Sequence, residues 1–395
     1  MLRLRRHLNL RFVVLAGLLV TSWASASFRA GQVCSADAFA VRDGFAASRR
    51  GTCTVLAPNH VRVEIRPERG KSKERINDST WYAFKVIPHT AGEVVITMRY
   101  KGGHHRYWPK MSVDGLTWYP IDESNIVVSS DRQEAEITLS LDSTPVWIAA
   151  QEVISPAIYG LWNKKTSRAT GIPLSLLGQS KAGQPIHLFD TDPKGKDVLF
   201  LLGRQHPPEV SGAFAFFAFT ESVLGDTALA RKFRERFRVI AIPVLNPDGI
   251  TGGNWRYNLG GVDLNRDWGR FKQPETALVG ELLDSLDAEG ARLRMFIDFH
   301  STNKNVFYTQ ENPTNPPGFT ARWLGAVKPM IPDYSFKIDP GPGENKRVAK
   351  NHIYKRYQIP SITYEVGDET SRAVTRAAAK AFAEELMRQM LAQEY

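Results

Sequence analysis

The pattern of apolar and polar positions divides the chain into two parts. Across residues 61–151, apolar and polar residues alternate in short runs, and Gly, Pro, Asn, Asp or Ser separates each run from the next. Such alternation is typical of half-buried strands, and the regular spacing of the turns favours an antiparallel β-sandwich. The predicted strands are residues 61–65, 81–87, 93–100, 110–113, 125–129, 135–141 and 145–150.

Beyond residue 155, apolar runs alternate with helical periodicity. Two strand-like runs around a Gly-bearing turn indicate a hairpin at residues 177–186. The strands predicted after it are 198–203, 239–244, 295–300 and 361–365, and the helices are 211–224, 274–286, 320–330 and 370–393. This alternation predicts an α/β fold, in which a mostly parallel mixed sheet is covered by helices on both faces and is preceded by the antiparallel β-sandwich.

The first 26 residues have the pattern of a secretory signal peptide. Four arginines precede an apolar run at residues 12–20 that is too short to span a bilayer, and Ala24-Ser25-Ala26 fits a small-residue cleavage site. We therefore expect a signal peptide at 1–26, a β-sandwich domain at 27–152 and an α/β domain at 153–395, in a periplasmic or secreted protein. The alternative is an uncleaved anchor. We expect no membrane span after signal cleavage.

Charge and composition narrow the class of partner. The 395 residues carry a formal net charge of +10, of which the arginines in residues 1–26 account for four. The modest excess that remains suits anionic partners such as cell-wall polymers or acidic peptides, or it reflects surface lysines alone. No basic motif or aromatic platform indicates nucleic acid.

Two further features of the N-terminal part leave alternatives open. Cys34 and Cys53 are the two cysteines, and in an oxidising compartment we expect one disulfide, with two buried thiols as the alternative. Seven aromatic residues of the predicted sandwich either form a binding face for sugar or peptide or pack in the core and at its edges. They are Trp81, Tyr82, Tyr100, Tyr107, Trp108, Trp118 and Tyr119.

Candidate metal ligands follow the predicted strands of the second part. His206 and Glu209 lie just after strand 198–203, and His300 ends strand 295–300. Open α/β sheets place their ligands at the carboxyl ends of strands. Two histidines and one glutamate, with a fourth position left for water, are typical of a catalytic zinc site. We therefore expect one zinc ion held by these three residues.

Other polar residues near the strand ends suggest hydrolytic chemistry. Glu365 can take a proton from the attacking water, and Arg256 can stabilise the developing oxyanion. Asn265 and Arg266 can bind a substrate carboxylate, and Asp298 is a candidate to orient one histidine. Each residue also has an ordinary structural explanation, such as a core histidine or a surface ion pair. Their joint occurrence in this order favours a site.

This order of residues resembles the M14 family of zinc metallocarboxypeptidases over about residues 155–395. The motifs that carry the resemblance are the hairpin at 177–186, Asn-Pro-Asp-Gly at 246–249 and Gly-Val-Asp-Leu-Asn-Arg at 261–266. The sandwich with Trp-Tyr-Ala-Phe at 81–84 resembles the extra domain of the cytosolic carboxypeptidase branch, which trims glutamates. The resemblance implies a zinc carboxypeptidase domain behind a β-sandwich, and the residue roles given above.

The chain departs from the family pattern at two points. The family has a mobile tyrosine about twenty residues before the late glutamate, and residues 341–345 contain none. Tyr334, Tyr354 and Tyr357 flank that segment and leave the role unassigned. Basic residues of the related branch receive acidic side chains, and among those of the corresponding segment we select Arg347 for this role.

These observations predict a secreted or periplasmic zinc metallocarboxypeptidase that removes C-terminal residues from peptides with a free C-terminal carboxylate. One alternative is a cell-envelope amidase or endopeptidase that uses the same zinc site to cut a γ-D-Glu–diaminopimelate bond of a peptidoglycan peptide. A free α-carboxylate next to the scissile bond distinguishes the two, since only the first requires it. A catalytically inactive binding protein is a third possibility, and the presence of all ligands and Glu365 argues against it.

Overall fold

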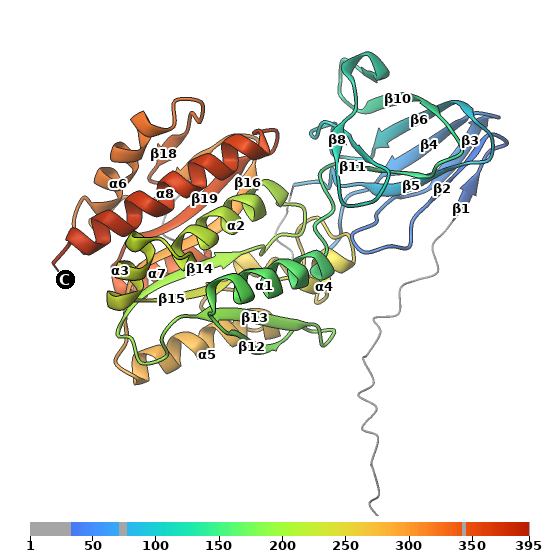
Figure 1. Ribbon diagram of the computed structural model, residues 1–395. Coiled ribbons are helices and arrows are strands. Elements are labelled where there is room, and N and C mark those ends of the chain that lie inside the picture. Colours follow the sequence, from blue (N-terminus) through green and yellow to red (C-terminus); the bar gives the residue numbers. More distant parts are fainter. Residues whose placement is uncertain (1–32, 71–76, 342–344, 395) are drawn as a thin grey trace, which may run out of the picture.

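The computed structural model describes residues 33–70, 77–341 and 345–394. A β-sandwich lies beside a larger α/β domain (Figure 1). The predicted signal peptide, with its cleavage point, falls outside the described residues. Over the described part, no single helix is long and apolar enough to cross a membrane, and only α2 (Val210–Leu224) and α3 (Ala228–Arg236), bent by 82°, reach that length and composition together.

Two sheets form the sandwich, with strand orders β1-β2-β5-β11-β7-β8 and β3-β4-β6-β10-β9. The strands are β1 Val33–Ser35, β2 Phe39–Arg42, β3 Cys53–Ala57, β4 His60–Ile65, β5 Ala83–Pro88, β6 Gly92–Tyr100, β7 Lys110–Ser112, β8 Tyr119–Pro120, β9 Ile126–Val128, β10 Glu134–Leu141 and β11 Val146–Ala149. All seven predicted strands are present. Neighbouring strands are antiparallel except β4 and β6, which pair in parallel. The prediction missed β1, β2, β3 and β8.

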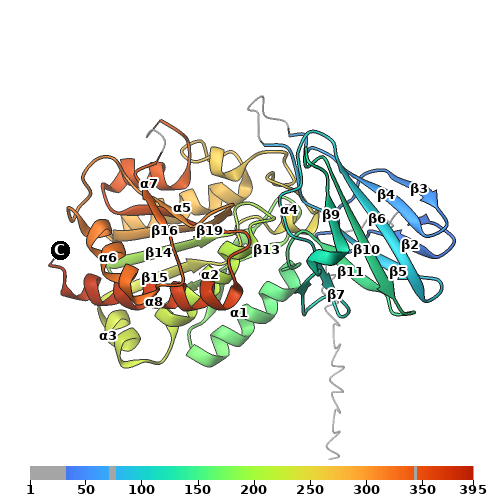
Figure 2. The same ribbon diagram turned by 90° about the horizontal axis from the view of Figure 1, so that it is seen from above.

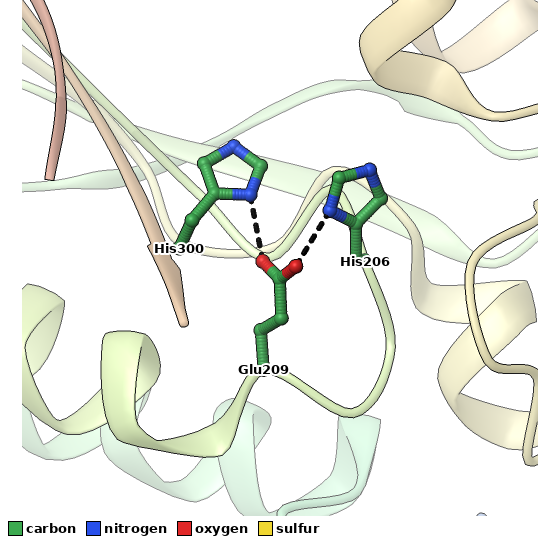
Figure 3. Close-up of side chains that lie close together, drawn as sticks. All are labelled: His206, Glu209 and His300. Atoms are coloured by element: carbon green, nitrogen blue, oxygen red, sulfur yellow. Dashed lines mark hydrogen bonds and ion pairs between the residues drawn. The ribbon is translucent and has the colours of Figure 1, made fainter. Parts of the chain in front are cut away.

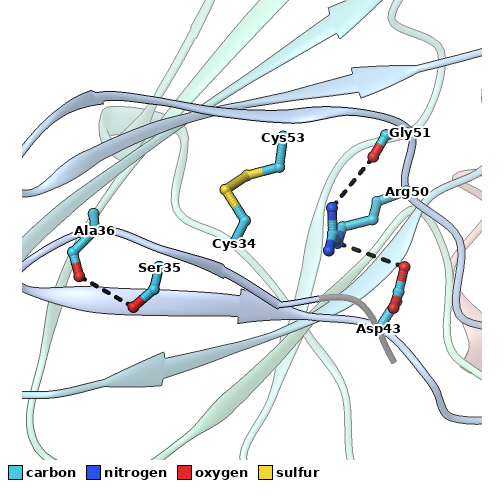
Figure 4. Close-up of a disulfide and its surroundings, with 7 residues drawn as sticks. All are labelled: Cys34, Ser35, Ala36, Asp43, Arg50, Gly51 and Cys53. Carbon is cyan, nitrogen blue, oxygen red and sulfur yellow. Dashed lines mark hydrogen bonds and ion pairs between the residues drawn. A yellow bond between two sulfur atoms is a disulfide. The ribbon is translucent and has the colours of Figure 1, made fainter. Parts of the chain in front are cut away.

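A disulfide joins Cys34 of β1 to Cys53 of β3, with a Cα–Cα distance of 6.0 Å (Figure 4). Because β1 and β3 belong to different sheets, the bond ties the two sheets of the sandwich together. The disulfide expectation is therefore confirmed. The aromatic residues of this domain mostly pack inside it: Trp81, Tyr82, Tyr100 and Tyr107 are buried, Trp108 and Trp118 are half-buried, and Tyr119 is exposed.

The second domain is built on an eight-stranded mixed sheet of order β12-β13-β15-β14-β16-β19-β17-β18. Its strands are β12 Leu174–Gln179, β13 Pro185–Asp190, β14 Asp197–Gly203, β15 Phe237–Ile242, β16 Arg292–Thr302, β17 Val306–Tyr308, β18 Lys337–Asp339 and β19 Ser361–Gly367. The central strands β15, β14, β16 and β19 are parallel to one another. The predicted α/β fold is confirmed.

Helices cover both faces of this sheet. The remaining helices are α1 Pro156–Thr170, α4 Pro247–Thr251, α5 Pro274–Ala288, α6 Phe319–Val327, α7 Ala349–Tyr357 and α8 Arg372–Ala392. Figure 2 shows α2, α3 and α8 on one face and α5 and α7 on the other. Each face has its own apolar core, and the core under α2 and α8 continues into the sandwich. The prediction missed the short helices α3, α4 and α7 and the strands β17 and β18.

Strand β14 lies where the sequential order of the strands across the sheet reverses. The chain passes from β14 to β15 on one side and then to β16 on the other. Such a switch point opens a crevice at the carboxyl ends of the strands. The loop 204–209 that leaves β14 therefore reaches this crevice, and α2 begins directly after it. Inside this loop, Arg204 donates hydrogen bonds to the carbonyl oxygen of Pro207 and to the Tyr159 hydroxyl, which fix its path.

The predicted ends of the two strands that carry His300 and Glu365 differ from the structure. β16 continues to Thr302 and β19 to Gly367, two residues beyond His300 and Glu365. Both residues therefore lie inside strands, where the parallel register pairs them directly. The prediction ended the strands early because polar residues interrupt each apolar run. As a result, the sheet ladder fixes the backbone of both residues.

A close approach of α2 to β16 holds the crevice together. Gly212, in the first turn of α2, donates its N–H to the Ser301 hydroxyl at 2.8 Å. A Cβ added at Gly212 would overlap the carbonyl oxygen of His300 and lie 2.7 Å from its carbonyl carbon. Since backbone cannot move aside as a flexible side chain does, only glycine allows the helix to pack at this distance.

Gly212→Ala is expected to lower the free energy of unfolding by about 1–3 kcal/mol, the usual cost of overpacking a core. Urea-induced unfolding of the purified protein measures this change. Gly160→Ala provides a matched control, because an added Cβ in helix α1 meets nothing within 4 Å. That control should gain about 0.5–1 kcal/mol from helix propensity. Equal effects of the two substitutions would contradict the packing argument.

Candidate metal centre

His206, Glu209 and His300 converge at the crevice (Figure 3). One ligand atom from each lies within 4.8 Å of the others. The Glu209 carboxylate lies between the two rings, with Oε1 2.7 Å from His206 Nδ1 and Oε2 2.6 Å from His300 Nδ1. The three predicted ligands are therefore brought together from the β14–α2 loop and β16.

Two buried carboxylates hold the outer nitrogens of the histidines. Asp298 Oδ2 lies 2.8 Å from His300 Nε2, and Asp263 Oδ1 lies 3.0 Å from His206 Nε2. A carboxylate at one ring nitrogen fixes the tautomer and turns the other nitrogen towards a metal ion. Asp298 thus has the position predicted for it. The same position of Asp263 was missed, because the sequence does not reveal which carboxylate faces which ring.

A second layer of hydrogen bonds fixes Asp298. Gln205 donates from Nε2 to Asp298 Oδ2 at 2.6 Å, and its Oε1 accepts the indole N–H of Trp268 at 3.0 Å. All three side chains are buried. Gln205 precedes His206 in the same loop. This loop therefore supplies the ligand His206 and also holds Asp298, which in turn holds the ligand His300. Such supporting contacts restrict how far the His300 ring can rotate.

Charge at the centre is strongly coupled. Burial alone would raise the pKa of Glu209, but His206 and His300 hold it below its ordinary value. Burial likewise opposes the charged form of His300, yet Asp298 and Glu209 raise its pKa well above the ordinary value. Glu209 and His300 therefore favour each other's charged forms.

These residues fit one zinc ion. Two imidazole nitrogens and one carboxylate match the ligand types of catalytic zinc sites. Next to the ligands, Glu365 Oε2 is a buried carboxylate oxygen with no hydrogen-bond partner among the described residues. An unpaired buried acceptor is costly, so a cation at this point would compensate it. The donor set and its surroundings are thus consistent with a zinc site.

The centre opens into a cleft of about 240 Å³. Seven of the eight predicted site residues line it: His206, Glu209, Arg256, Asn265, Arg266, His300 and Glu365. Arg347 is exposed and does not line the cleft, whereas its neighbours Lys346 and Lys350 do. The sequence analysis selected Arg347, whereas the structure places Lys346 and Lys350 at the cleft. Lys350 lies in the first turn of helix α7, which begins at Ala349, and Lys346 precedes that helix.

Glu365 lies next to the ligands in a setting suited to a general base. Burial, followed by the nearby charge of Glu209, raises its pKa to about 7. A base works best when its pKa lies near the working pH. Its Oε2 is buried and has no partner among the described residues, so that oxygen is available for a proton.

The cleft also contains groups suited to binding anions. Arg256 donates from Nε to Asp263 Oδ2 at 2.5 Å, and the other oxygen of the same carboxylate contacts His206. Asn265 Oδ1 accepts the backbone N–H of Ala349 at 2.8 Å, and its amide nitrogen has no hydrogen-bond partner within the described chain. Arg266 follows it and donates to the Asn265 carbonyl oxygen at 2.8 Å. Asp263 therefore supports both His206 and Arg256.

One tyrosine at the cleft was missed by the sequence analysis. Tyr308, on the short strand β17, lines the cleft near Glu365. Of the three tyrosines considered before, none lines the cleft. The hydroxyl of Tyr354 donates to the Pro313 carbonyl, and that of Tyr334 is bonded to Tyr364. Strand β17 has three residues and lies far from the expected segment, so no sequence signal marked Tyr308.

The fold and the site together define an α/β protein with a mononuclear metal centre in the crevice of a mixed sheet. The model of the zinc carboxypeptidase family matches residues 158–370. The chain belongs to this family, which supports a hydrolase of the metallocarboxypeptidase type.

Relatives and solved structures agree with this family. Over 154 residues the chain is 32% identical to cytosolic carboxypeptidase 1 of Danio rerio. This match covers 36% of this chain and only 13% of that protein. It is 23% identical to an uncharacterized protein of Zymomonas mobilis, over 72% of this chain and 78% of that protein. The chain thus spans well under two thirds of the Danio rerio protein.

Similar folds occur in two solved metallo-carboxypeptidases. The protein from Burkholderia cenocepacia matches with a TM-score of 0.75 and 19% identity, over 90% of this chain and 99% of that chain. A protein from Pseudomonas aeruginosa, in complex with (2-guanidinoethylmercapto)succinic acid, matches with a TM-score of 0.71 and 21% identity, over 89% and 98%. Both similarities extend over the sandwich as well as the α/β domain.

Asp298→Asn should weaken zinc binding by about 10–100-fold, the usual effect of removing the carboxylate that orients a ligand histidine. Competition with a fluorescent zinc chelator measures the affinity. Asp142→Asn, at an exposed turn, is the control and should bind zinc as the wild type does. Unchanged affinity in Asp298→Asn would show that the carboxylate does not orient His300.

Proposed function

We propose that this protein is a zinc-dependent metallocarboxypeptidase that hydrolyses the C-terminal peptide bond of peptides with a free α-carboxylate. The convergence of His206, Glu209 and His300 beside Glu365, in one cleft lined by anion-binding groups, carries this proposal. Membership of the zinc carboxypeptidase family supports it. The coupling of a metal centre to a free buried carboxylate is the arrangement that metal-assisted hydrolysis needs.

The residues of the cleft divide the work of hydrolysis. Zinc, when bound, supplies a Lewis acid that polarises the scissile carbonyl and favours ionisation of water. Glu365 takes the proton of the attacking water and later gives it to the leaving amine. Arg256, held by Asp263, stabilises the negative charge that develops on the carbonyl oxygen.

A separate group of residues anchors the end of the substrate. Asn265 and Arg266 lie next to each other at the cleft and can bind the terminal carboxylate, with the guanidinium supplying its planar pair of donors. Lys346 and Lys350 add positive charge beside them. This arrangement supports removal of single residues from a free C-terminus, and binding of acidic terminal residues.

The place of action follows from the N-terminal pattern. The charged and apolar segments of residues 1–26 support secretion, so we propose a periplasmic or secreted enzyme that acts on peptides of the cell envelope or its surroundings. The disulfide between Cys34 and Cys53 agrees with an oxidising compartment. Fractionation of expressing cells, with detection of the mature protein outside the cytoplasm, tests this location.

Glu365→Gln is expected to keep zinc and the fold but to lower kcat by about 10²–10⁴-fold, because the general base is lost. Peptides ending in Glu, Lys, Leu or Phe, together with a peptidoglycan stem peptide, serve as substrates. Mass spectrometry of the products then reports release of one terminal residue. C-terminally amidated peptides are the matched controls and should resist cleavage.

Other products would point to the other functions. Cleavage of the stem peptide alone, at a bond without an adjacent free carboxylate, would contradict the carboxypeptidase and favour the amidase. No turnover of any substrate, with zinc bound and ligand binding unchanged by a chelator, would favour the binding protein.

The value of kcat/KM should decrease at acidic pH, because Glu365 becomes protonated there. Burial raises the pKa of Glu365 to about 7, and a bound cation opposes that rise. The base is active when ionised, so kcat/KM should fall as pH decreases through a midpoint at or below neutrality. Steady-state rates across the acid range measure this decrease, with zinc content determined at each pH because protonated histidines release metal. A kcat/KM that rises on acidification would contradict the role of Glu365.

A further inference from the structure

The β-sandwich contributes a wall of the cleft. Asn77, Arg106 and Tyr107 line the cleft together with the residues of the α/β domain. Arg106 and Tyr107 belong to the connection between β6 and β7. The sandwich therefore lies against the opening to the metal centre, where it can meet a bound peptide.

Arg106 is held firmly at this wall. Its Nε donates to Asp368 Oδ2 at 2.8 Å, and a terminal nitrogen lies 2.8 Å from the same oxygen. The guanidinium carbon lies 5.0 Å from the ring centre of Tyr107 and 5.5 Å from that of Trp255. The other terminal nitrogen has no hydrogen-bond partner in the described part of the chain. A stacked guanidinium with a spare donor is well placed to bind an anion.

Contacts on each side of the metal centre define the course of a substrate. Asn265 is bonded to Ala349 at the start of α7, so the carboxylate anchor and the lysines of that segment lie on one side. Arg106 stacks on Trp255, the neighbour of Arg256, and is bonded to Asp368, beyond the end of β19. Both groups line the same cleft, so a peptide with its terminal carboxylate at the anchor can extend towards the sandwich wall.

The charge of the cleft favours acidic substrates on both sides. Five basic side chains line it, Arg106, Arg256, Arg266, Lys346 and Lys350. The two acidic residues that line it, Glu209 and Glu365, both belong to the metal centre. At the sandwich wall, the acidic partner of Arg106 is Asp368, which does not line the cleft, so Arg106 is the charged side chain that faces the cleft there.

We propose that the sandwich forms the subsite for the residue that precedes the scissile bond, and that Arg106 selects an acidic side chain there. This inference rests on the proposed carboxypeptidase function. The opposing explanation is that Arg106 only braces the two domains. Other contacts already do so: Lys110 Nζ lies 3.3 Å from Glu369, and Glu68 accepts the backbone N–H of Arg256 at 2.7 Å.

The test uses peptide pairs that share one terminal residue and carry Glu or Gln before it. In the wild type, kcat/KM for the Glu peptide should exceed that for the Gln peptide by about tenfold, as expected for one charged hydrogen bond. Arg106→Ala should bring this ratio close to one by lowering the rate on the Glu peptide. Arg106→Lys should keep part of the preference, because the positive charge remains.

Two matched variants separate binding from bracing. Asp368→Asn removes the partner of Arg106 but leaves the guanidinium, and Lys110→Met removes a bridge between the domains outside the cleft. Both should keep the Glu/Gln ratio of the wild type. A ratio unchanged in Arg106→Ala, or lowered equally in Asp368→Asn, would overturn the proposal.

A binding measurement keeps this inference apart from the proposed function. Calorimetry with zinc-loaded Glu365→Gln protein compares the dissociation constants of the two peptides without turnover. The Glu peptide should bind about tenfold more tightly, and Arg106→Ala in the same background should remove that difference. Lack of turnover in the wild type would tell against the carboxypeptidase alone, whereas equal binding of both peptides would tell against the Arg106 subsite alone.

Discussion

The structure depends on how two buried imidazoles are held. Asp263 and Asp298 bind the outer nitrogens of His206 and His300, so both inner nitrogens face the Glu209 carboxylate. Acids and imidazoles inside a protein are stable only when each finds a partner. The crevice of the sheet supplies those partners, and the unpaired oxygen of Glu365 that remains favours a cation at its centre.

Backbone geometry makes this arrangement possible. The parallel register of β16 and β19 sets His300 directly opposite Glu365, and Gly212 lets α2 approach the backbone of His300. The metal ligands and the proposed base thus come from neighbouring elements with fixed backbones. The sandwich completes the cleft through Arg106 and Tyr107, so it is more than a support for the larger domain.

Much of this was visible in the sequence, because local patterns carry local structure. An uninterrupted apolar run followed at once by His206 and Glu209 is enough to place both ligands at a strand end. The pairing of His300 with Glu365 depends on the order of strands in the sheet, which apolar patterns do not encode. Arg106 lies in an irregular connection between strands, where no periodicity indicates its direction.

Which of the neighbouring basic residues lines the cleft was not visible in the sequence for a similar reason. Arg347 and Lys350 differ only in their place relative to the first turn of α7, and that helix was missed because its apolar residues are few. Short strands such as β17 offer too few positions for alternation to be read, and Tyr308 was overlooked with it. Tertiary packing, rather than local propensity, decides these details.

The most direct test of the account is a zinc titration of the metal-free protein, with release of a terminal residue from a peptide as the readout. One metal centre predicts that activity rises linearly with added zinc and reaches its plateau at one equivalent per chain. Activity that is already complete in the metal-free protein, or that requires two equivalents, would contradict a single centre formed by His206, Glu209 and His300.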